Sequence, residues 1–454
     1  MHGRPRLLTP PAGQRRPPAR RLARRAAPGG RRDAGAAAFL AFFLASALAA
    51  SGARAQDEKK PEPPPGWRAK LFSLENPSAG FRIALKGYVQ ADFRSYQDWT
   101  AEDTDGNRSL PPDFEWRRAR IGFEGDWRRL SFDVNVDPAF DRGNELKDAW
   151  VGLRLSKAIQ LRGGNMKLPV GSEFQISPAK TDFIERAAFV ESIGPNRDWG
   201  ALVRGEVSRA VEYQAGVFAG DNRSSEKGAG TTGTARLVLE PRPWLALGGS
   251  FSQGDVQADP AGPGLAPQPK GLPGQGVTGY LFFPSVYVDG RRLRWGADAR
   301  VETGPFSLWG EFLETREERK GQGETLLDLP DVRGDGWSAN ATWLVTGEKK
   351  TRTIRARRSL FHGPGAVEIA ARYESLRFDD VGNQGDEVAG RRAANLRPAG
   401  YRAFTSGLSW WTSPILRLLG DVVVERYDDS LRAPTSGKKG NYVTLLGRVQ
   451  VHLP

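Results

Sequence analysis

Short segments in which apolar and polar residues alternate recur along the chain from residue 81 to its end. In the first segment, Phe81, Ile83 and Leu85 alternate with Arg82 and Lys86. Successive side chains of a β-strand point to opposite faces, so each segment predicts a strand with one apolar face and one charged face. The pattern predicts about sixteen strands, at residues 81–96, 114–125, 128–137, 145–154, 158–166, 198–206, 210–219, 232–240, 243–252, 292–302, 305–316, 335–345, 365–377, 400–411, 414–426 and 440–453.

The connections between these segments are alternately short and long. One connection, 346–364, breaks the rule because it is long and basic where a short turn is expected. Alternating strands also occur in soluble β-sandwiches, but tight turns on one rim and long loops on the other are typical of a closed barrel whose apolar faces meet lipid. The sequence therefore favours an all-β, transmembrane antiparallel β-barrel. Its long loops are expected at 97–113, 167–197, 253–291, 317–334 and 378–399.

The first 55 residues predict a cleaved secretory signal peptide. Many arginines precede the apolar stretch 36–50, and Ala53-Arg54-Ala55 supplies a small-x-small cleavage site. An apolar stretch of about fifteen residues is short for a membrane-spanning helix. A start codon further downstream is an alternative explanation of the long arginine-rich stretch before residue 36. Residues 56–80 are expected to form a Pro-rich periplasmic lead-in, and residues 81–454 the barrel domain.

Removal of the leader changes the charge of the chain. The 454 residues carry 66 basic and 53 acidic side chains, and residues 1–55 hold eleven of the basic ones and one acidic one, which leaves a net charge of +3. The net charge of +13 of the full chain would suggest nucleic-acid binding, but most of this charge lies in the leader, so the suggestion loses its main support. The chain has no cysteine, and His2, His362 and His452 are far apart, which argues against disulfides, a zinc site or a catalytic triad. We expect no enzymatic activity, no metal and no cofactor.

The charged faces of the strands would line water inside such a barrel, and many of their residues are arginines. Guanidinium groups bind phosphate and carboxylate oxygens, and rings of them select anions. Acidic residues are nearly as frequent on the same faces, so pairing across the wall is the alternative role for any one arginine. The arginines assigned to these inner faces include Arg118, Arg120, Arg162, Arg294 and Arg402.

The third long loop, 167–197, is the best candidate for a constriction. It contains Lys167, Lys180 and Arg186, together with apolar residues that are unfavourable in a loop surrounded by water. We predict that it folds inward, with these three cations beside the solute path. An external lid is the alternative. The Gly- and Pro-rich stretch 262–276, in contrast, predicts a mobile external loop. The apolar residues of the third loop are Phe174, Ile176, Phe183, Ile184 and Phe189.

Several short motifs carry a family resemblance. They are Arg117-Arg118-Ala119-Arg120-Ile121-Gly122-Phe123-Glu124-Gly125, Lys167-Leu168-Pro169-Val170-Gly171, Asp182-Phe183-Ile184-Glu185-Arg186, Arg197-Asp198-Trp199-Gly200, Trp343-Leu344-Val345-Thr346-Gly347-Glu348 and Gly365-Ala366-Val367-Glu368-Ile369-Ala370-Ala371-Arg372-Tyr373. In their order and spacing the chain resembles the phosphate-selective porins O and P of Gram-negative outer membranes. The resemblance implies a sixteen-stranded barrel that forms a homotrimer, with its third external loop in the lumen and with arginines and lysines that guide phosphate-like anions.

These patterns together predict an outer-membrane porin for the passive diffusion of small solutes. Its expected partners are outer-membrane lipid and small anionic solutes such as phosphate, with no nucleic acid. A general or carbohydrate-passing porin with weak charge preference is one alternative. A plugged structural or adhesive surface barrel that uses loops 253–291 and 378–399 is another. All inward assignments depend on register, because a slip of one residue reverses the faces of a strand.

Overall fold

The chain divides into two units, Met1–Glu62 and Pro63–Pro454, and the computed structural model describes residues of the second unit only. The predicted signal peptide, His2 and His362 lie outside the described residues. The described residues are 66, 68–70, 72–97, 113–139, 143–220, 230–258, 269–323, 326–351, 354, 363, 365–381, 398–435 and 440–453.

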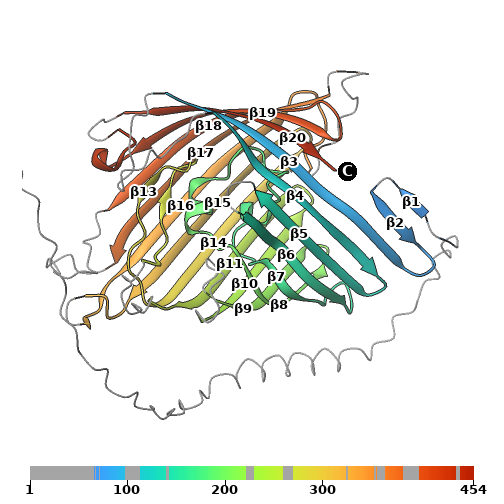
Figure 1. Cartoon of the computed structure of the whole chain (residues 1–454), viewed down its shortest axis with the longest axis horizontal. Coiled ribbons are helices and arrows are strands. Elements are labelled where there is room, and N and C mark those ends of the chain that lie inside the picture. Colours follow the sequence, from blue (N-terminus) through green and yellow to red (C-terminus); the bar gives the residue numbers. More distant parts are fainter. Residues whose placement is uncertain are drawn as a thin grey trace, which may run out of the picture. The chain divides into compact units, whose positions relative to one another are not determined.

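Sixteen of the described strands form one closed antiparallel barrel, as predicted (Figure 1). Each pairs with its neighbours along the chain, and β20 pairs with β3, from Val443 opposite Gln97 to His452 opposite Tyr88. The first eight strands are β3 (Phe81–Gln97), β4 (Asp113–Trp127), β5 (Leu130–Ala139), β6 (Gly143–Arg154), β7 (Gln160–Lys167), β8 (Arg197–Ser208), β9 (Val211–Ala219) and β10 (Thr231–Arg242). The other eight are β11 (Leu245–Val256), β14 (Gly290–Thr303), β15 (Phe306–Arg319), β16 (Leu329–Leu344), β17 (Ala366–Val381), β18 (Ala399–Trp411), β19 (Leu416–Tyr427) and β20 (Tyr442–His452).

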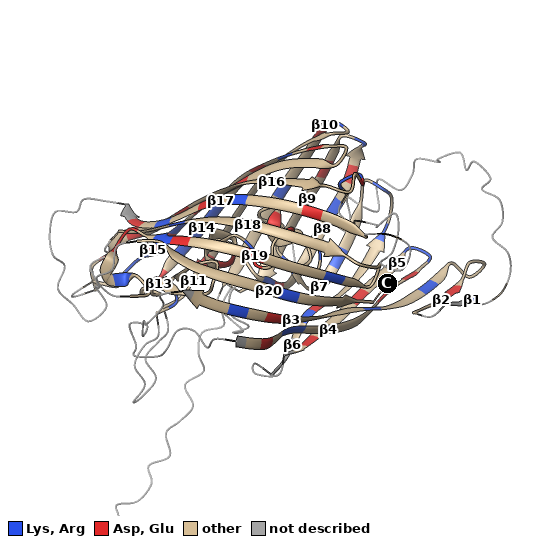
Figure 2. Ribbon diagram, turned by 90° about the horizontal axis from the view of Figure 1, so that it is seen from above, with Lys and Arg blue, Asp and Glu red and all other residues tan. Residues whose placement is uncertain are grey.

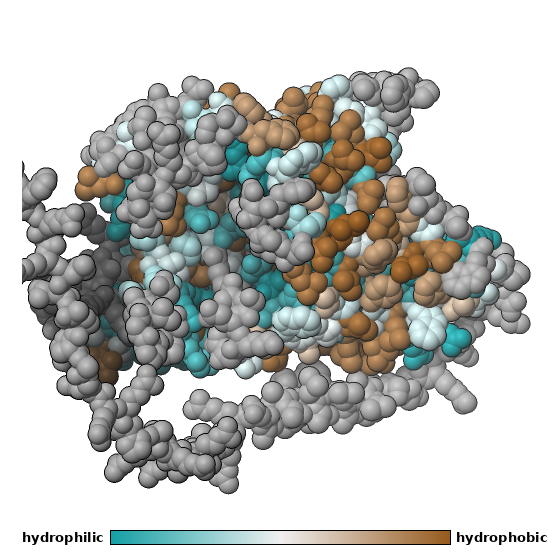
Figure 3. Space-filling view, viewed as in Figure 1, coloured by the Kyte–Doolittle hydropathy of each residue, from teal (hydrophilic) through white to brown (hydrophobic). Residues whose placement is uncertain are grey.

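Most apolar side chains of these strands point outward, and most charged side chains point inward. Phe251 is 47% exposed and Val151 is 61% exposed, whereas Arg292 and Arg294 are each 2% exposed. Figure 3 shows the apolar side chains gathered on the outer surface, and Figure 2 shows basic and acidic residues interleaved along the strands. A soluble sandwich would bury the apolar faces and expose the charged ones. The observed exposure is the reverse, as expected for a barrel surrounded by lipid.

Connections on the two rims differ in length as the sequence predicts. Two residues, Arg128 and Arg129, join β4 to β5, whereas residues 168–196 separate β7 from β8. The exceptional long connection between Leu344 and Ala366 is also present. Within the described part of the chain, no helix has both the length and the apolar character needed to span a membrane.

The structure adds short elements that the alternation pattern does not predict. A hairpin of β1 (Arg68–Lys70) and β2 (Ser73–Asn76) extends the sheet, because β2 pairs with the start of β3. The β7–β8 connection contains the 3-10 helix η2 (Glu173–Gln175) and the helix α2 (Ala188–Ile193). The β11–β14 connection contains β12 (Gly274–Gln275) and β13 (Leu281–Phe283), and the β19–β20 connection contains η4 (Ser430–Arg432).

Candidate functional site

Backbone groups of residues 168–196, which we call the crossing segment, hydrogen bond to inner-face side chains of seven strands remote from β7 and β8. Backbone groups of the crossing segment donate or accept, and wall side chains supply the other half of each bond. These wall residues are Gln90 (β3), Ser250 (β11), Arg294 (β14), Glu311 (β15), Arg372 and Glu374 (β17), Arg417 and Asp421 (β19) and Arg448 and Gln450 (β20).

These contacts satisfy backbone groups that are removed from water. The Glu311 carboxylate accepts hydrogen bonds from the backbone N–H groups of Ser172 (2.9 Å) and Glu173 (2.7 Å). Arg448 Nη1 donates to the backbone oxygen of Ile184 at 2.6 Å. A buried irregular segment requires such partners because unpaired backbone groups are costly. The charged wall residues therefore hold the crossing segment in one arrangement.

The apolar residues of the crossing segment are buried, as their composition suggests. Ile184 and Phe189 pack in the large hydrophobic cluster together with Leu313 of β15 and Leu376 of β17. The guanidinium of Arg372 lies over the ring of Phe183, 4.7 Å from its centroid. Apolar packing and polar anchoring thus act on the same segment.

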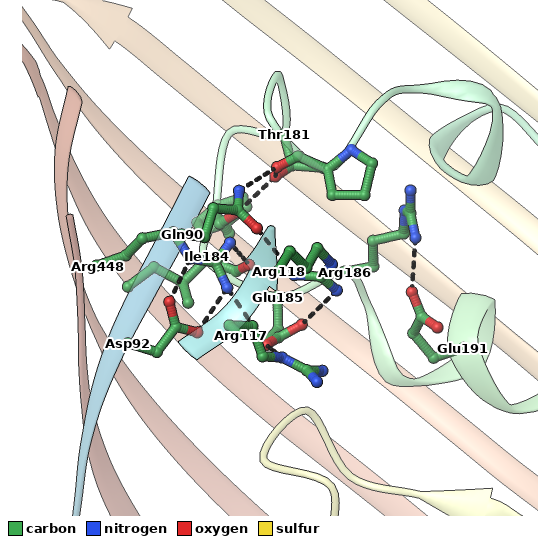
Figure 4. A network of polar contacts seen from close by, with 12 residues as sticks. Gln90, Asp92, Arg117, Arg118, Thr181, Ile184, Glu185, Arg186, Glu191 and Arg448 are labelled. Carbon is green, nitrogen blue, oxygen red and sulfur yellow. Dashed lines mark hydrogen bonds and ion pairs between the residues drawn. The ribbon is translucent and has the colours of Figure 1, made fainter. Parts of the chain in front are cut away.

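The carboxylate of Glu185, from the crossing segment, lies among four arginines of the barrel wall, and Figure 4 shows three of them, Arg117, Arg118 and Arg448. Its oxygens are 3.0 Å from Arg94 Nη2, 2.9 Å from Arg117 Nε, 3.8 Å from Arg118 Nη2 and 3.5 Å from Arg448 Nη2. These arginines come from β3, β4 and β20. We call the four side chains the arginine cluster.

A β-bulge explains how two consecutive residues of β4 both contact Glu185. Gln90 of β3 is opposite Arg118, but the next residue, Ala91, is opposite Trp116, so Arg117 is the extra residue. Strict alternation would point Arg117 toward lipid. A bulge re-aims a side chain in this way. Alternation therefore predicts Arg118, but not Arg117, on the inner face.

Two glutamates of the crossing segment have shifted pKa values of opposite sign. Burial alone would raise the pKa of Glu185, but the positive charges of Arg117, Arg118, Arg448 and Arg94 hold it well below its ordinary value. Burial raises the pKa of Glu173 to about 7, and the charge of Arg372 offsets this only in part. Glu185 is thus a permanent anion at neutral pH, whereas Glu173 ionises near it.

The long connection between β16 and β17 also holds the crossing segment. Lys350 Nζ lies 2.6 Å from Asp182 Oδ1 and contacts the buried carboxylate of Glu368. Trp309 Nε1 donates to the other oxygen of Asp182 at 3.2 Å. Lys350 therefore links one rim of the barrel to the crossing segment.

A second segment, residues 269–289, packs against the inner face near the ends of β17–β19. Leu272 N donates to Glu317 at 2.9 Å, and Phe283 stacks on Phe378 with centroids 4.3 Å apart. The prediction of a mobile external loop over 262–276 is wrong for residues 269–276, because their Gly and Pro content fits tight packing as well as exposure. Residues 262–268 lie outside the described part.

This packing also corrects the assignment of Arg402 to the inner face. Its neighbours Tyr401 and Ala403 are buried, and Phe282 of the second segment stacks on Tyr401. The inner face of β18 is therefore apolar at this level. Arg402 points the other way and pairs with Asp428 at 2.8 Å on the surface.

Three of the predicted site residues hold the crossing segment rather than stand free. Lys167 Nζ donates to the backbone oxygens of residues 174, 175 and 176, at 2.6, 3.3 and 3.1 Å. Arg186 pairs with Glu191 at 2.8 Å and donates to the Ile176 oxygen. Arg294 Nε donates to the Ile193 oxygen at 2.8 Å. Each cation caps backbone carbonyls in this arrangement.

The other four predicted residues divide into paired and unpaired cations. Arg120 pairs with Asp137 at 3.0 Å, and Arg118 belongs to the arginine cluster. Arg162 stacks on Trp150 at 4.0 Å and has no ion pair with a described residue. Lys180 is exposed and likewise has no ion pair with any residue that the structure describes. The sequence therefore predicts the positions of the cations but not the Glu185 carboxylate that lies among the arginines of the cluster.

The described residues contain no group of three or more His, Cys, Asp or Glu side chains arranged to hold a metal. His452 lies at the end of β20 and stacks near Tyr88, at 6.4 Å between centroids.

The comparisons with known proteins agree with this architecture. The family described as phosphate-selective porin O and P matches residues 83–450. No curated protein sequence matches the chain significantly. The solved structures with a similar fold include two at low identity. OmpT of Vibrio cholerae in its trimer form has a TM-score of 0.54 at 9% identity, covering 82% of this chain and 100% of that chain. An anion-selective porin from Comamonas acidovorans has a TM-score of 0.51 at 12% identity, with the same coverage.

Proposed function

Because this chain belongs to the phosphate-selective porin O and P family, we propose that it passes small solutes by passive diffusion and favours anions. The family and the closed barrel indicate an outer-membrane porin of a Gram-negative bacterium. No chemical step is part of the proposal.

The crossing segment forms the constriction in this proposal. Its hydrogen bonds to β3, β11, β14, β15, β17, β19 and β20 support a course through the lumen, since these bonds join inner-face side chains of strands remote from both of its ends. The wall of β5–β10 would then border the remaining path. Pore radius and selectivity would depend on the side chains that face each other there.

The observation that carries the anion preference is a set of cations that have no carboxylate partner among the described residues. Arg162 of β7, Arg204 of β8 and Lys180 of the crossing segment have no ion pair with a described residue. In the β7–β8 register, Arg204 is opposite Gln160, two residues from Arg162. Two inner-face guanidinium groups on neighbouring strands raise the local concentration of anions.

Phosphate is the specific solute that the family name suggests, and a general porin is the alternative. Guanidinium forks bind phosphate and carboxylate oxygens alike. The interior also holds many acidic side chains, among them Glu311 and Glu374, so a weak charge preference is the competing proposal. We propose phosphate among the favoured anions, together with a homotrimer and cleavage of the leader after residue 55.

The second segment gives one specific observation in favour of a plugged barrel. Residues 269–289 pack in the same hydrophobic cluster as the crossing segment, which reduces the space inside. A conductance measurement distinguishes the anion-favouring porin from a general porin and from a plugged barrel. Refolded protein in a planar bilayer should give discrete chloride-conducting channels, and added phosphate should reduce that current. Current without a phosphate effect favours a general porin, and no current from inserted protein favours the plugged barrel.

A further inference from the structure

Glu185 is the one side chain of the crossing segment that lies among all four arginines of the cluster. Its backbone is held independently, because Arg372 donates to the Glu185 oxygen at 3.1 Å and Asp421 accepts from the Ile184 N–H at 2.7 Å. The carboxylate is therefore free to change partners without release of the backbone at residues 184 and 185.

The arginine cluster carries more positive charge than its fixed partners neutralise. Asp92 pairs with Arg448, and Glu115 lies 3.1 Å from Arg94 and 3.8 Å from Arg117. Among the side chains that the structure describes, two wall carboxylates thus accompany four arginines. Glu185 brings the sum of these charges from +2 to +1.

Solvent has access to part of this cluster. The side chain of Arg117 is 21% exposed, that of Arg94 is 14% exposed and that of Arg118 is 13% exposed, whereas that of Arg448 is 1% exposed. Guanidinium groups that bind a carboxylate also bind other oxyanions, because the same N–H donors fit both. A dissolved oxyanion in the lumen would therefore meet three donors that Glu185 already occupies.

We propose that the arginine cluster is an oxyanion-binding site of the wall and that the Glu185 carboxylate occupies it as a tethered competitor of the solute. This rests on the proposed function, since the solute must enter the lumen. A tethered group acts at a high effective concentration. The competition keeps solute binding weak, and weak binding is what permits release on the far side of a pore.

Equilibrium dialysis of inorganic phosphate against the folded, detergent-solubilised protein tests this directly. E185Q should bind phosphate at least about tenfold more tightly than wild type, because a close unit charge is worth more than 1.4 kcal/mol. E191Q is the matched control, since Glu191 lies on the same segment but pairs with Arg186, and its affinity should equal that of wild type. The double variant R117Q/E185Q should lose the gain.

Equal phosphate affinity of wild type and E185Q, both migrating as folded barrels on unheated gels, would overturn the proposal. E185S offers the same comparison if E185Q does not fold. Equilibrium dialysis measures phosphate binding without any ion current, so its result does not depend on whether the protein conducts. A protein that fails to conduct but shows the tenfold difference supports the site and contradicts the channel. A conducting protein without the difference contradicts the site alone.

Discussion

Arg448 donates two hydrogen bonds of 2.6 Å to the carboxylate of Asp92, and the pair joins the last strand of the barrel to the first. The residues are 356 positions apart in the chain and directly opposite in the β20–β3 register. Both side chains are 1% exposed. The pair therefore stabilises the seam at which the barrel closes, beside the Glu185 carboxylate.

Loss of one partner at this seam should cost more than loss of both. D92A leaves Arg448 buried with less compensating charge, so the free energy of unfolding should fall by about 3–5 kcal/mol. D92A/R448M removes the buried cation as well and should be less destabilised than D92A. Urea unfolding in lipid vesicles measures both. A double variant that is less stable than D92A would show that the pair is not the main interaction of Arg448.

The outward orientation of Val422 predicts a large penalty for a charge at that position. Val422 is 40% exposed and lies in the middle of β19, between buried Asp421 and Val423. V422R should lower the free energy of unfolding by about 2–4 kcal/mol, because the guanidinium would face hydrocarbon. L431R is the control, since Leu431 is exposed in η4, and its effect should stay within about 0.5 kcal/mol. Equal effects of the two changes would contradict a lipid-facing Val422.

The unpaired arginines of β7 and β8 predict a change in selectivity without a change in fold. R162Q/R204Q removes two inner-face cations that have no ion pair with a described residue. The chloride-to-potassium permeability ratio should fall by at least about twofold. K157Q, an exposed change in the β6–β7 turn, should leave the ratio unchanged. A ratio in R162Q/R204Q equal to that of K157Q would mean that the solute path lies elsewhere.

The raised pKa of Glu173 predicts a stability that decreases with pH. Between about pH 4.5 and 7 the folded protein retains a proton on Glu173 that the unfolded chain releases. The contribution is therefore complete below pH 4.5 and is lost as pH rises through about 7, by up to about 3 kcal/mol. Urea unfolding of wild type and E173Q over this range checks it. E173Q should lack this component, and an identical pH profile in both proteins would contradict the shift.

The alternation of apolar and polar residues predicts most of the fold. The register of a strand with one apolar and one charged face is strongly determined, because only the apolar face can meet lipid. The sixteen strands, the tight and long connections and the inward orientation of Arg118, Arg120, Arg162 and Arg294 followed from it. The buried apolar residues of the crossing segment, such as Phe189, were also recognisable, since a loop surrounded by water gains nothing from them.

The remaining features depend on contacts between distant parts of the chain. The bulge at Arg117 has no signature in a two-residue period, and the inner apolar face around Tyr401 exists because Phe282 packs there. The role of Glu185 cannot be predicted from the sequence, since nothing in its neighbours along the chain indicates the arginines of β3, β4 and β20. Lys167 and Arg186 were predicted beside the path as cations, but their donors go to backbone oxygens and to Glu191.

The zero-current potential of the refolded wild-type protein in a planar bilayer, under a gradient of potassium chloride, is the most direct test of an anion-favouring pore. The account predicts a potential whose sign corresponds to chloride as the more permeant ion. The preference for chloride should weaken at high salt, because screening shortens the range over which the charges of Arg162 and Arg204 attract anions. A potential near zero, or one whose sign corresponds to potassium as the more permeant ion, measured on conducting channels would contradict an anion-favouring pore.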